Sequence, residues 1–153
     1  GERRLFMTCR AGHPLAGSRP TLLQVLSFPL VTVFMHGPKA RGAYLGSGDA
    51  GVPDPSRKGF TPAIEVNSID TAKQVARNSN ALLPASRQMV AAELKRGELV
   101  CLDYDTPQMR TRSALVRLRD RTPSPVALKF MELVRTVESE LLALDAIPIK
   151  VAA

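Results

Sequence analysis

Short apolar runs alternate along the chain with segments in which apolar residues recur at helical spacing. The apolar runs predict β-strands at residues 3–9, 30–35, 60–66, 81–84, 99–103 and 113–119. Helical spacing predicts helices at residues 21–27, 69–77, 87–96 and 125–144. Residues 37–59 are rich in Gly, Pro, Ser and Asp, so we expect a weak helix around 39–45 and then a long loop.

The expected helix ends carry residue types that favour caps. These are Thr21, Ser68, Ser86, Ser124-Pro125 and, at a C-terminal end, Gly97. Strands that alternate with helices over roughly 110 residues favour an α/β fold with a mostly parallel sheet. In such sheets, ligands bind at the carboxyl ends of the strands, close to helix N-termini.

Composition is that of a folded domain with a core. Of the 153 residues, 44% are hydrophobic, which argues against disorder. No apolar run reaches the roughly 18 residues of a membrane helix, and Gly1–Leu5 lacks the apolar stretch of a signal peptide. The two cysteines, Cys9 and Cys101, lie in apolar runs. We expect two reduced, buried thiols in a cytoplasmic protein, with a single disulfide as the alternative.

The net charge of +7 raises the question of nucleic-acid binding. However, the basic residues are dispersed, and the densest run, at 110–121, alternates arginines with apolar residues as on the outer face of a strand. Aromatic residues make up 5% of the chain and are not interleaved with the basic ones, so no stacking platform is indicated. We therefore expect a solvated basic surface.

The sequence contains no recognisable catalytic or metal-binding motif. His13 and His36 are far apart and lack Cys, Asp or Glu at ligand spacing, so we expect no metal and no cofactor. His13 precedes proline in a turn and is expected at the surface or in a capping role. His36 directly follows the strand at 30–35 and could face a cleft. Without a nucleophile motif, paired carboxylates or a phosphate-binding loop, the chain is not expected to be an enzyme.

One segment combines features of a binding site. Asn67, Ser68 and Ile69 follow a predicted strand and begin a predicted helix, where free backbone N–H groups and the helix dipole favour a carboxylate. Ser68 could equally be a plain N-cap, a role that any helix start calls for. Both interpretations remain open from the residues alone.

Several segments, in order, resemble the effector-binding domain of LysR-type transcriptional regulators. The resemblance covers residues 3 to 143 and lies in Ala11–Ala16 with its "HPLA" turn, Phe28–Leu30, Leu82–Pro84, Val90–Leu94 followed by Gly97–Leu99, and Arg121–Pro125. One departure is the turn Arg77–Asn80, which lacks the glycine that this family commonly has there. The family's N-terminal winged helix-turn-helix and linker helix have no counterpart in this chain, which therefore resembles a truncated regulator.

The resemblance implies an α/β, periplasmic-binding-protein-like (type 2) fold of two lobes with the effector between them. This chain would hold one complete Rossmann-like subdomain and the C-terminal part of the other. Residues 1–17 would form the last strand of subdomain I and the hinge, residues 18–112 subdomain II, and residues 113–153 a crossing strand and a final helix returning to subdomain I. Asn67, Ser68, Ile69 and His36 would face the cleft.

The same resemblance implies the partners. They are a small-molecule effector, expected to be an organic acid, and further copies of the chain, as a dimer or as the tetramer of a full-length regulator. DNA would be bound only through the N-terminal domain missing from this chain, and no membrane is involved. The alternative is a solute-binding or small-molecule-processing enzyme domain of the same bilobal fold.

Overall fold

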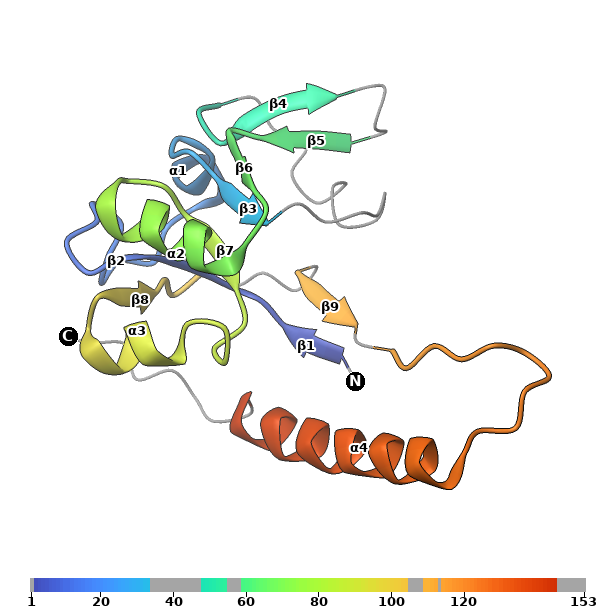
Figure 1. Cartoon of the computed structure of the whole chain (residues 1–153). Helices are drawn as coiled ribbons and strands as arrows, with labels where there is room; N and C mark the ends of the chain where they lie inside the picture. Colours follow the sequence, from blue (N-terminus) through green and yellow to red (C-terminus); the bar gives the residue numbers. More distant parts are fainter. Residues whose placement is uncertain (1, 34–47, 55–58, 105–108, 113, 146–153) are drawn as a thin grey trace.

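The computed structural model describes residues 2–33, 48–54, 59–104, 109–112 and 114–145 (Figure 1). Its elements, in chain order, are β1 (Glu2–Arg4), β2 (Phe6–Arg10), α1 (Leu22–Leu26), β3 (Val31–Val33), β4 (Gly51–Asp54), β5 (Gly59–Pro62), β6 (Ile64–Val66), α2 (Ile69–Asn78), β7 (Leu83–Ala85), α3 (Ala91–Arg96), β8 (Leu99–Cys101), β9 (Arg110–Arg112) and α4 (Pro125–Asp145).

The central sheet is mixed, which corrects the expectation of a mostly parallel one. Strand β2 lies between β7 and β8 and is antiparallel to both, whereas β3 and β6 are parallel to each other. A parallel bridge between Leu30 and Leu82 joins the two parts. The chain enters the sheet on β2 from the β1–β9 ladder and leaves it on β8 in the opposite direction. Strand β8 is therefore antiparallel to β2, as β7 also is.

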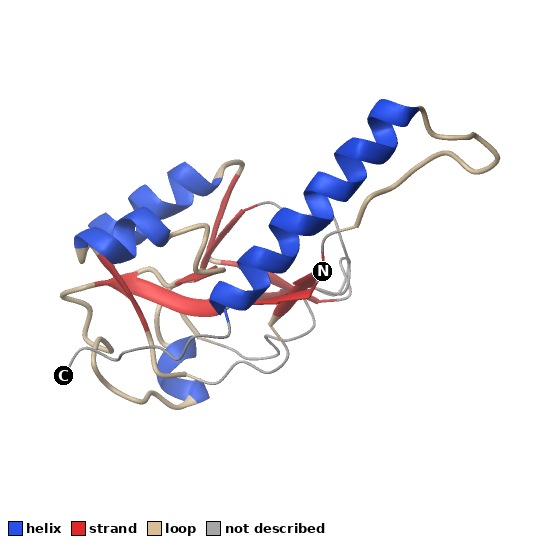
Figure 2. Ribbon diagram, turned by 90° about the horizontal axis from the view of Figure 1, so that it is seen from below, coloured by secondary structure: helices blue, strands red, loops and turns tan. Residues whose placement is uncertain are grey.

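Apolar residues pack on both faces of this sheet, and helices lie on both sides of it (Figure 2). On one face, Val25 and Leu26 of α1 pack with a cluster that includes Met7, Leu30 and Leu82. On the other, helices α2 and α3 cover a second cluster, formed by Val31, Ala72, Ala76, Ala81, Leu83, Ala85, Val90 and Leu99. Successive residues of a strand point to opposite faces, so the short strands supply both clusters.

The two cysteines are both free. Cys9 pairs across the β2–β8 ladder with Val100, and Cys101 pairs with Thr8. Because directly opposed residues share a face and successive residues alternate, the thiols lie on opposite faces of the sheet. This register excludes the disulfide that the sequence left as an alternative. Cys9 is buried, and its burial raises the pKa of the thiol to about 12. Cys101 is only half-buried.

His13 is buried, with 4% of its surface exposed, so its expected surface position was wrong. Its Nδ1 accepts a hydrogen bond from the Leu15 backbone N–H (3.0 Å), which confirms the capping role. Its Nε2 lies 3.2 Å from the Asn80 carbonyl oxygen. Its ring packs edge-on against Phe28, with 4.5 Å between the two ring centroids. Arg10 donates to the Asn80 side chain at 2.8 Å. These bonds hold the glycine-free turn after α2.

The burial of His13 predicts a loss of stability in acid. Desolvation by burial lowers its pKa from the ordinary 6.5, and the Arg10 charge acts in the same direction. Below about pH 6.5 the unfolded chain binds a proton that the folded chain does not, so the free energy of unfolding falls as pH falls. In urea titrations between about pH 7 and pH 5, this slope should be shallower in His13→Gln. An unchanged slope in His13→Gln would contradict the prediction.

Five local expectations differ from the structure. The strand expected at 3–9 is interrupted at Leu5, and that expected at 60–66 at Ala63, whose N–H bonds Ala50. Strand β4 lies in the expected loop and pairs with β5.

Ser86 accepts a hydrogen bond from the Met89 N–H (3.4 Å), but α3 begins only at Ala91. Residues 114–119 form no strand and are exposed, because an alternating segment becomes a strand only beside a partner strand.

Helix α4 begins where the sequence predicts. The Ser124 Oγ accepts a hydrogen bond from the Ala127 N–H at 3.2 Å. The first half of the helix projects, together with the segment before it, beyond the sheet and the other helices (Figure 2). Two polar contacts connect its second half to the sheet side: Arg3 forms an ion pair with Glu138, and the Gln88 amide donates to the Leu141 carbonyl at 3.1 Å.

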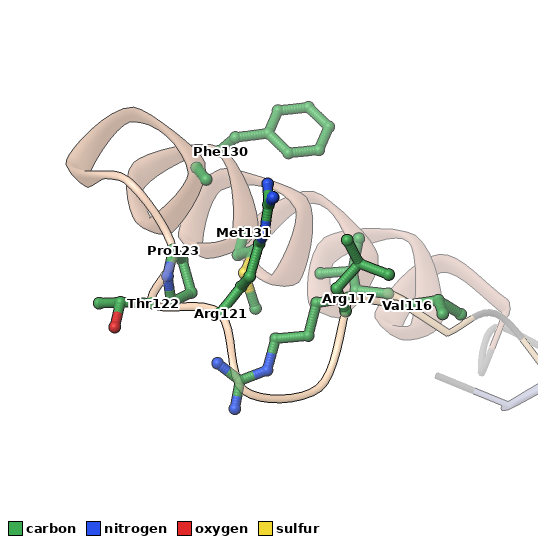
Figure 3. A pocket seen from close by; sticks show the side chains of 10 residues that line it. Val116, Arg117, Arg121, Thr122, Pro123, Phe130 and Met131 are labelled. Atoms are coloured by element: carbon green, nitrogen blue, oxygen red, sulfur yellow. The ribbon is translucent and has the colours of Figure 1, made fainter.

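The segment before α4 folds back beside it and encloses an open groove of about 340 Å³ (Figure 3). The groove is mostly apolar, with two guanidinium groups in its lining. Its lining residues include Leu115, Val116, Arg117, Leu118, Arg121 and Phe130.

Candidate functional site

The candidate site lies where two parallel strands end. Strands β3 and β6 pair in parallel, with Val33 opposite Val66 at their carboxyl ends. Helix α2 begins three residues after Val66, so the segment from Asn67 to Ile69 leaves the sheet at the edge where ligands bind in open α/β sheets. His36, which the sequence also assigned to the cleft, lies outside the described residues.

The start of α2 is a well-formed cap. The Ser68 Oγ accepts a hydrogen bond from the Thr71 backbone N–H at 3.1 Å and lies 2.9 Å from the Thr71 hydroxyl oxygen. Asn67 is exposed and Ser68 is half-buried, whereas Ile69 packs against the second core cluster. Two neighbouring hydroxyls therefore stand at the positive end of the helix dipole. The structure confirms Ser68 as an N-cap, and its ligand role stays a prediction.

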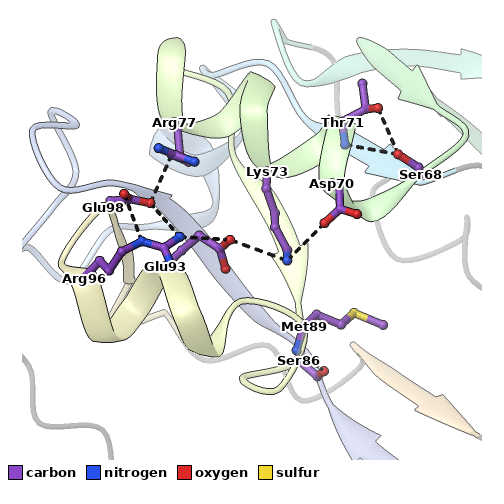
Figure 4. Close-up of polar contacts among 10 residues, drawn as sticks. All are labelled: Ser68, Asp70, Thr71, Lys73, Arg77, Ser86, Met89, Glu93, Arg96 and Glu98. Atoms are coloured by element: carbon purple, nitrogen blue, oxygen red, sulfur yellow. Dashed lines mark hydrogen bonds and ion pairs between the residues drawn. The ribbon is translucent and has the colours of Figure 1, made fainter.

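A charged network connects this helix start to α3 (Figure 4). The Lys73 ammonium lies 3.4 Å from Asp70 in the first turn of α2 and 3.5 Å from Glu93 of α3. The Lys73 side chain is 15% exposed and the Glu93 side chain 9%. Within the described residues, the second carboxylate oxygen of Glu93 is buried without a hydrogen-bond partner.

Arginines extend the network along the outside of α3. The Arg96 guanidinium lies 3.4 Å from Glu93 and 3.0 Å from Glu98, and Arg77 of α2 reaches Glu98 at 3.2 Å. The hydrogen bond from Arg96 lowers the pKa of the Glu98 carboxyl. Sequence reasoning missed this network. The only local signals are the three-residue spacings Asp70 to Lys73 and Glu93 to Arg96, which any solvated helix can show.

The described residues offer little for catalysis or metal binding. Among them, no three His, Cys, Asp or Glu side chains gather closely enough to hold a metal ion. In the same part of the chain, no helix is both long enough and apolar enough to cross a membrane. The arrangement consists of neutral hydroxyls and backbone donors at a strand edge, with a paired lysine behind them. It suits recognition of a small polar molecule.

The fold is that of an open-sheet α/β domain. The family model for the LysR substrate binding domain matches residues 1–139. The chain therefore belongs to the LysR substrate-binding domain family. Such domains are the regulatory parts of LysR-type transcription regulators, so the family match favours a regulatory domain over the solute-binding or enzymatic alternative.

Solved structures show the same fold at low identity. Full-length HypT from Salmonella typhimurium, a hypochlorite-specific LysR-type regulator, is 20% identical, with a TM-score of 0.53. The match covers 92% of this chain and 45% of HypT. The bromide-bound regulatory domain of HypT is 21% identical with a TM-score of 0.52, over 92% of this chain and 63% of that domain. Among curated proteins, no significant match was found.

Proposed function

We propose that this chain is an effector-sensing region of a LysR-type regulator and that the start of α2 binds the carboxylate of a small organic acid. The observation that carries the proposal is the pair of hydroxyls, Ser68 and Thr71, at an N-terminus that follows a parallel strand. Backbone N–H groups and the helix dipole favour a negative charge at this position. Asn67 and Ile69 complete the lining, and His36 is a further candidate.

The sensing role follows from the two-lobed organisation expected of the family. Residues 1–17 and 113–153 would belong to the hinge and subdomain I, and residues 18–112 to subdomain II. An acid bound between the lobes would stabilise their closed arrangement, because it contacts both sides only there. The closed arrangement would in turn change how the full-length oligomer presents its DNA-binding domains. The protein would bind DNA through those domains and would perform no catalysis.

A charge placed at Ser68 tests the site without removing the cap. Aspartate is as good an N-cap as serine, so Ser68→Asp should fold normally, but its carboxylate repels an acid. In a full-length regulator that carries this chain, assayed in a reporter strain with a panel of mono- and dicarboxylates, Ser68→Asp should abolish induction. Ser68→Ala should shift the dose response by about tenfold, as expected for one lost hydrogen bond to a charged group.

A second cap separates binding from helix stability. Thr21 caps α1 with the same kind of hydrogen bond and lies in a different helix. Thr21→Ala should therefore lower stability by about 1 kcal/mol, as Ser68→Ala does, and leave induction unchanged. DNA affinity should be the same in all variants. Normal induction of Ser68→Asp by every acid that induces the parent would remove the start of α2 from the effector site.

A further inference from the structure

The Lys73 ammonium contacts one carboxylate in the interior and one at the surface (Figure 4). Glu93 of α3 lies 3.5 Å away, and its side chain is 9% exposed. Asp70 lies 3.4 Å away, and its side chain is 87% exposed. Side chains on a helix lean toward its N-terminus, so Lys73 reaches back to Asp70 in the first turn of α2. A cation therefore lies beside the hydroxyls of the effector site proposed above.

The two carboxylates differ in how easily Lys73 can release them. Among the described residues, the second carboxylate oxygen of Glu93 is buried without a hydrogen-bond partner. Loss of Lys73 would remove a counter-charge from this buried group, which is costly. The Asp70 carboxylate is solvated, and an exposed ion pair with lysine contributes little free energy. An incoming anion should therefore displace Asp70 and leave the ion pair between Lys73 and Glu93 intact.

We propose that Lys73 binds a second acidic group of the effector and that Asp70 occupies this position when the effector is absent. This inference rests on the proposed function of the α2 start and narrows the effector to a short dicarboxylate. One carboxylate would accept hydrogen bonds from the Ser68 and Thr71 hydroxyls and from first-turn N–H groups. The other would bind the Lys73 ammonium. Asp70 then competes with the effector and raises the concentration that the site requires.

The distance between the two positions suits a short diacid. At roughly 100° per residue, Thr71 and Lys73 lie on opposite flanks of α2, so they are separated by about one helix diameter, roughly 10 Å. With a hydrogen bond of about 2.8 Å at each end, a dicarboxylate of about four to six carbon atoms spans this gap. A monocarboxylate can occupy only one of the two positions. The ammonium therefore distinguishes the two classes of acid.

Calorimetry on the full-length regulator that carries this chain tests the proposal. The probes are succinate, glutarate and adipate, each compared with the monocarboxylate of the same chain length: butyrate, valerate or hexanoate. At least one diacid should bind about tenfold more tightly than its monoacid, as expected for one added hydrogen bond between charged groups. Asp70→Asn should tighten diacid binding by about two- to fivefold, because the competing carboxylate is removed.

A variant that lacks the ammonium must keep its fold. Lys73→Met alone takes a counter-charge from Glu93, so Lys73→Met is combined with Glu93→Leu. The double variant should bind the diacid only as tightly as the monoacid and should leave monoacid binding unchanged, whereas a general structural defect would weaken both. Glu132→Gln is the matched control: it removes an exposed carboxylate three residues from Lys129 in α4 and should change neither affinity.

Equal affinity for diacids and monoacids, or no binding of any of the six acids, would overturn the proposal. A diacid preference that survives in the double variant would overturn the role of Lys73, and an Asp70→Asn variant no tighter than the parent would overturn that of Asp70. If monoacids bind as well as diacids and Ser68→Asp abolishes their binding, the proposed effector site stands without a second anion position. Binding that Ser68→Asp leaves intact would instead remove the α2 start itself.

Discussion

Replacing Leu82 with alanine is expected to lower the free energy of unfolding by about 3 kcal/mol, within the roughly 2–5 kcal/mol typical of large-to-small changes in a core. Leu82 is fully buried and forms the bridge with Leu30 that joins the parallel and antiparallel parts of the sheet. Its backbone accepts from Val31 at 2.9 Å and donates to Pro29 at 2.8 Å, and alanine keeps both bonds. The expected loss therefore arises from packing alone.

Urea unfolding followed by circular dichroism measures this loss. Leu23→Ala is the matched control, because Leu23 is 79% exposed and its truncation should change stability by less than about 0.5 kcal/mol. Both variants should be compared with the parent at one protein concentration, since self-association would add to the apparent stability. A loss below about 1 kcal/mol in Leu82→Ala would contradict the packing described around the bridge.

The second large effect is expected from Lys73. In Lys73→Met, the buried carboxylate of Glu93 keeps, among the described residues, only Arg96 as a cation within ion-pair distance, so stability should fall by about 2 kcal/mol. Removal of both charges should recover most of this loss, because an apolar pair of similar volume needs no compensation. The double variant Lys73→Met with Glu93→Leu should therefore lie within about 1 kcal/mol of the parent.

An exposed ion pair provides the comparison. Arg19 lies 3.9 Å from Asp103 at the surface, and Arg19→Met should change stability by less than about 1 kcal/mol. If Lys73→Met lowered stability no more than Arg19→Met, the Lys73–Glu93 ion pair would not stabilise the packing of α2 and α3. If the double variant were weaker than Lys73→Met alone, Glu93 would contribute through something other than its charge.

Helix ends were the most predictable part of the fold. Thr21, Ser68 and Ser124 cap the helices that the sequence assigned to them, and Gly97 ends α3 in a left-handed conformation with φ of 69°. Caps depend on contacts three or four residues apart, so the local sequence contains all the information. Ser86 is the exception, because it bonds the Met89 N–H and the helix starts later.

Strand pairing was less predictable because its partners lie far apart in the sequence. Apolar alternation at 113–119 was consistent with a strand, yet the described part, residues 114–119, forms no strand and is exposed. The direction of β2 depends on β7 and β8, which follow it by more than seventy residues. The β4–β5 hairpin was missed because Gly and Pro at 51–62 are typical of loops.

The candidate site also combines local features, which the sequence predicts, with long-range contacts, which it does not. Ser68 could be placed at a helix start after a strand from the sequence alone, because both features are local. The ion pair between Lys73 and Glu93 could not, because it depends on how α2 and α3 pack over the sheet. Burial of His13 depends on the distant Phe28 and Asn80 in the same way.

Two alanines behind α2 have a consequence for how the binding specificity of this domain can change. Ala72 and Ala76 are fully buried where α2 packs on the second core cluster, and small side chains there let the helix lie close to the sheet. Any larger residue at either position would lift or tilt the helix and move the first-turn hydroxyls with it. Mutations that never touch an effector would thus move the site proposed above, so selection screens for altered effector response should cover the back of α2 as well as its exposed start.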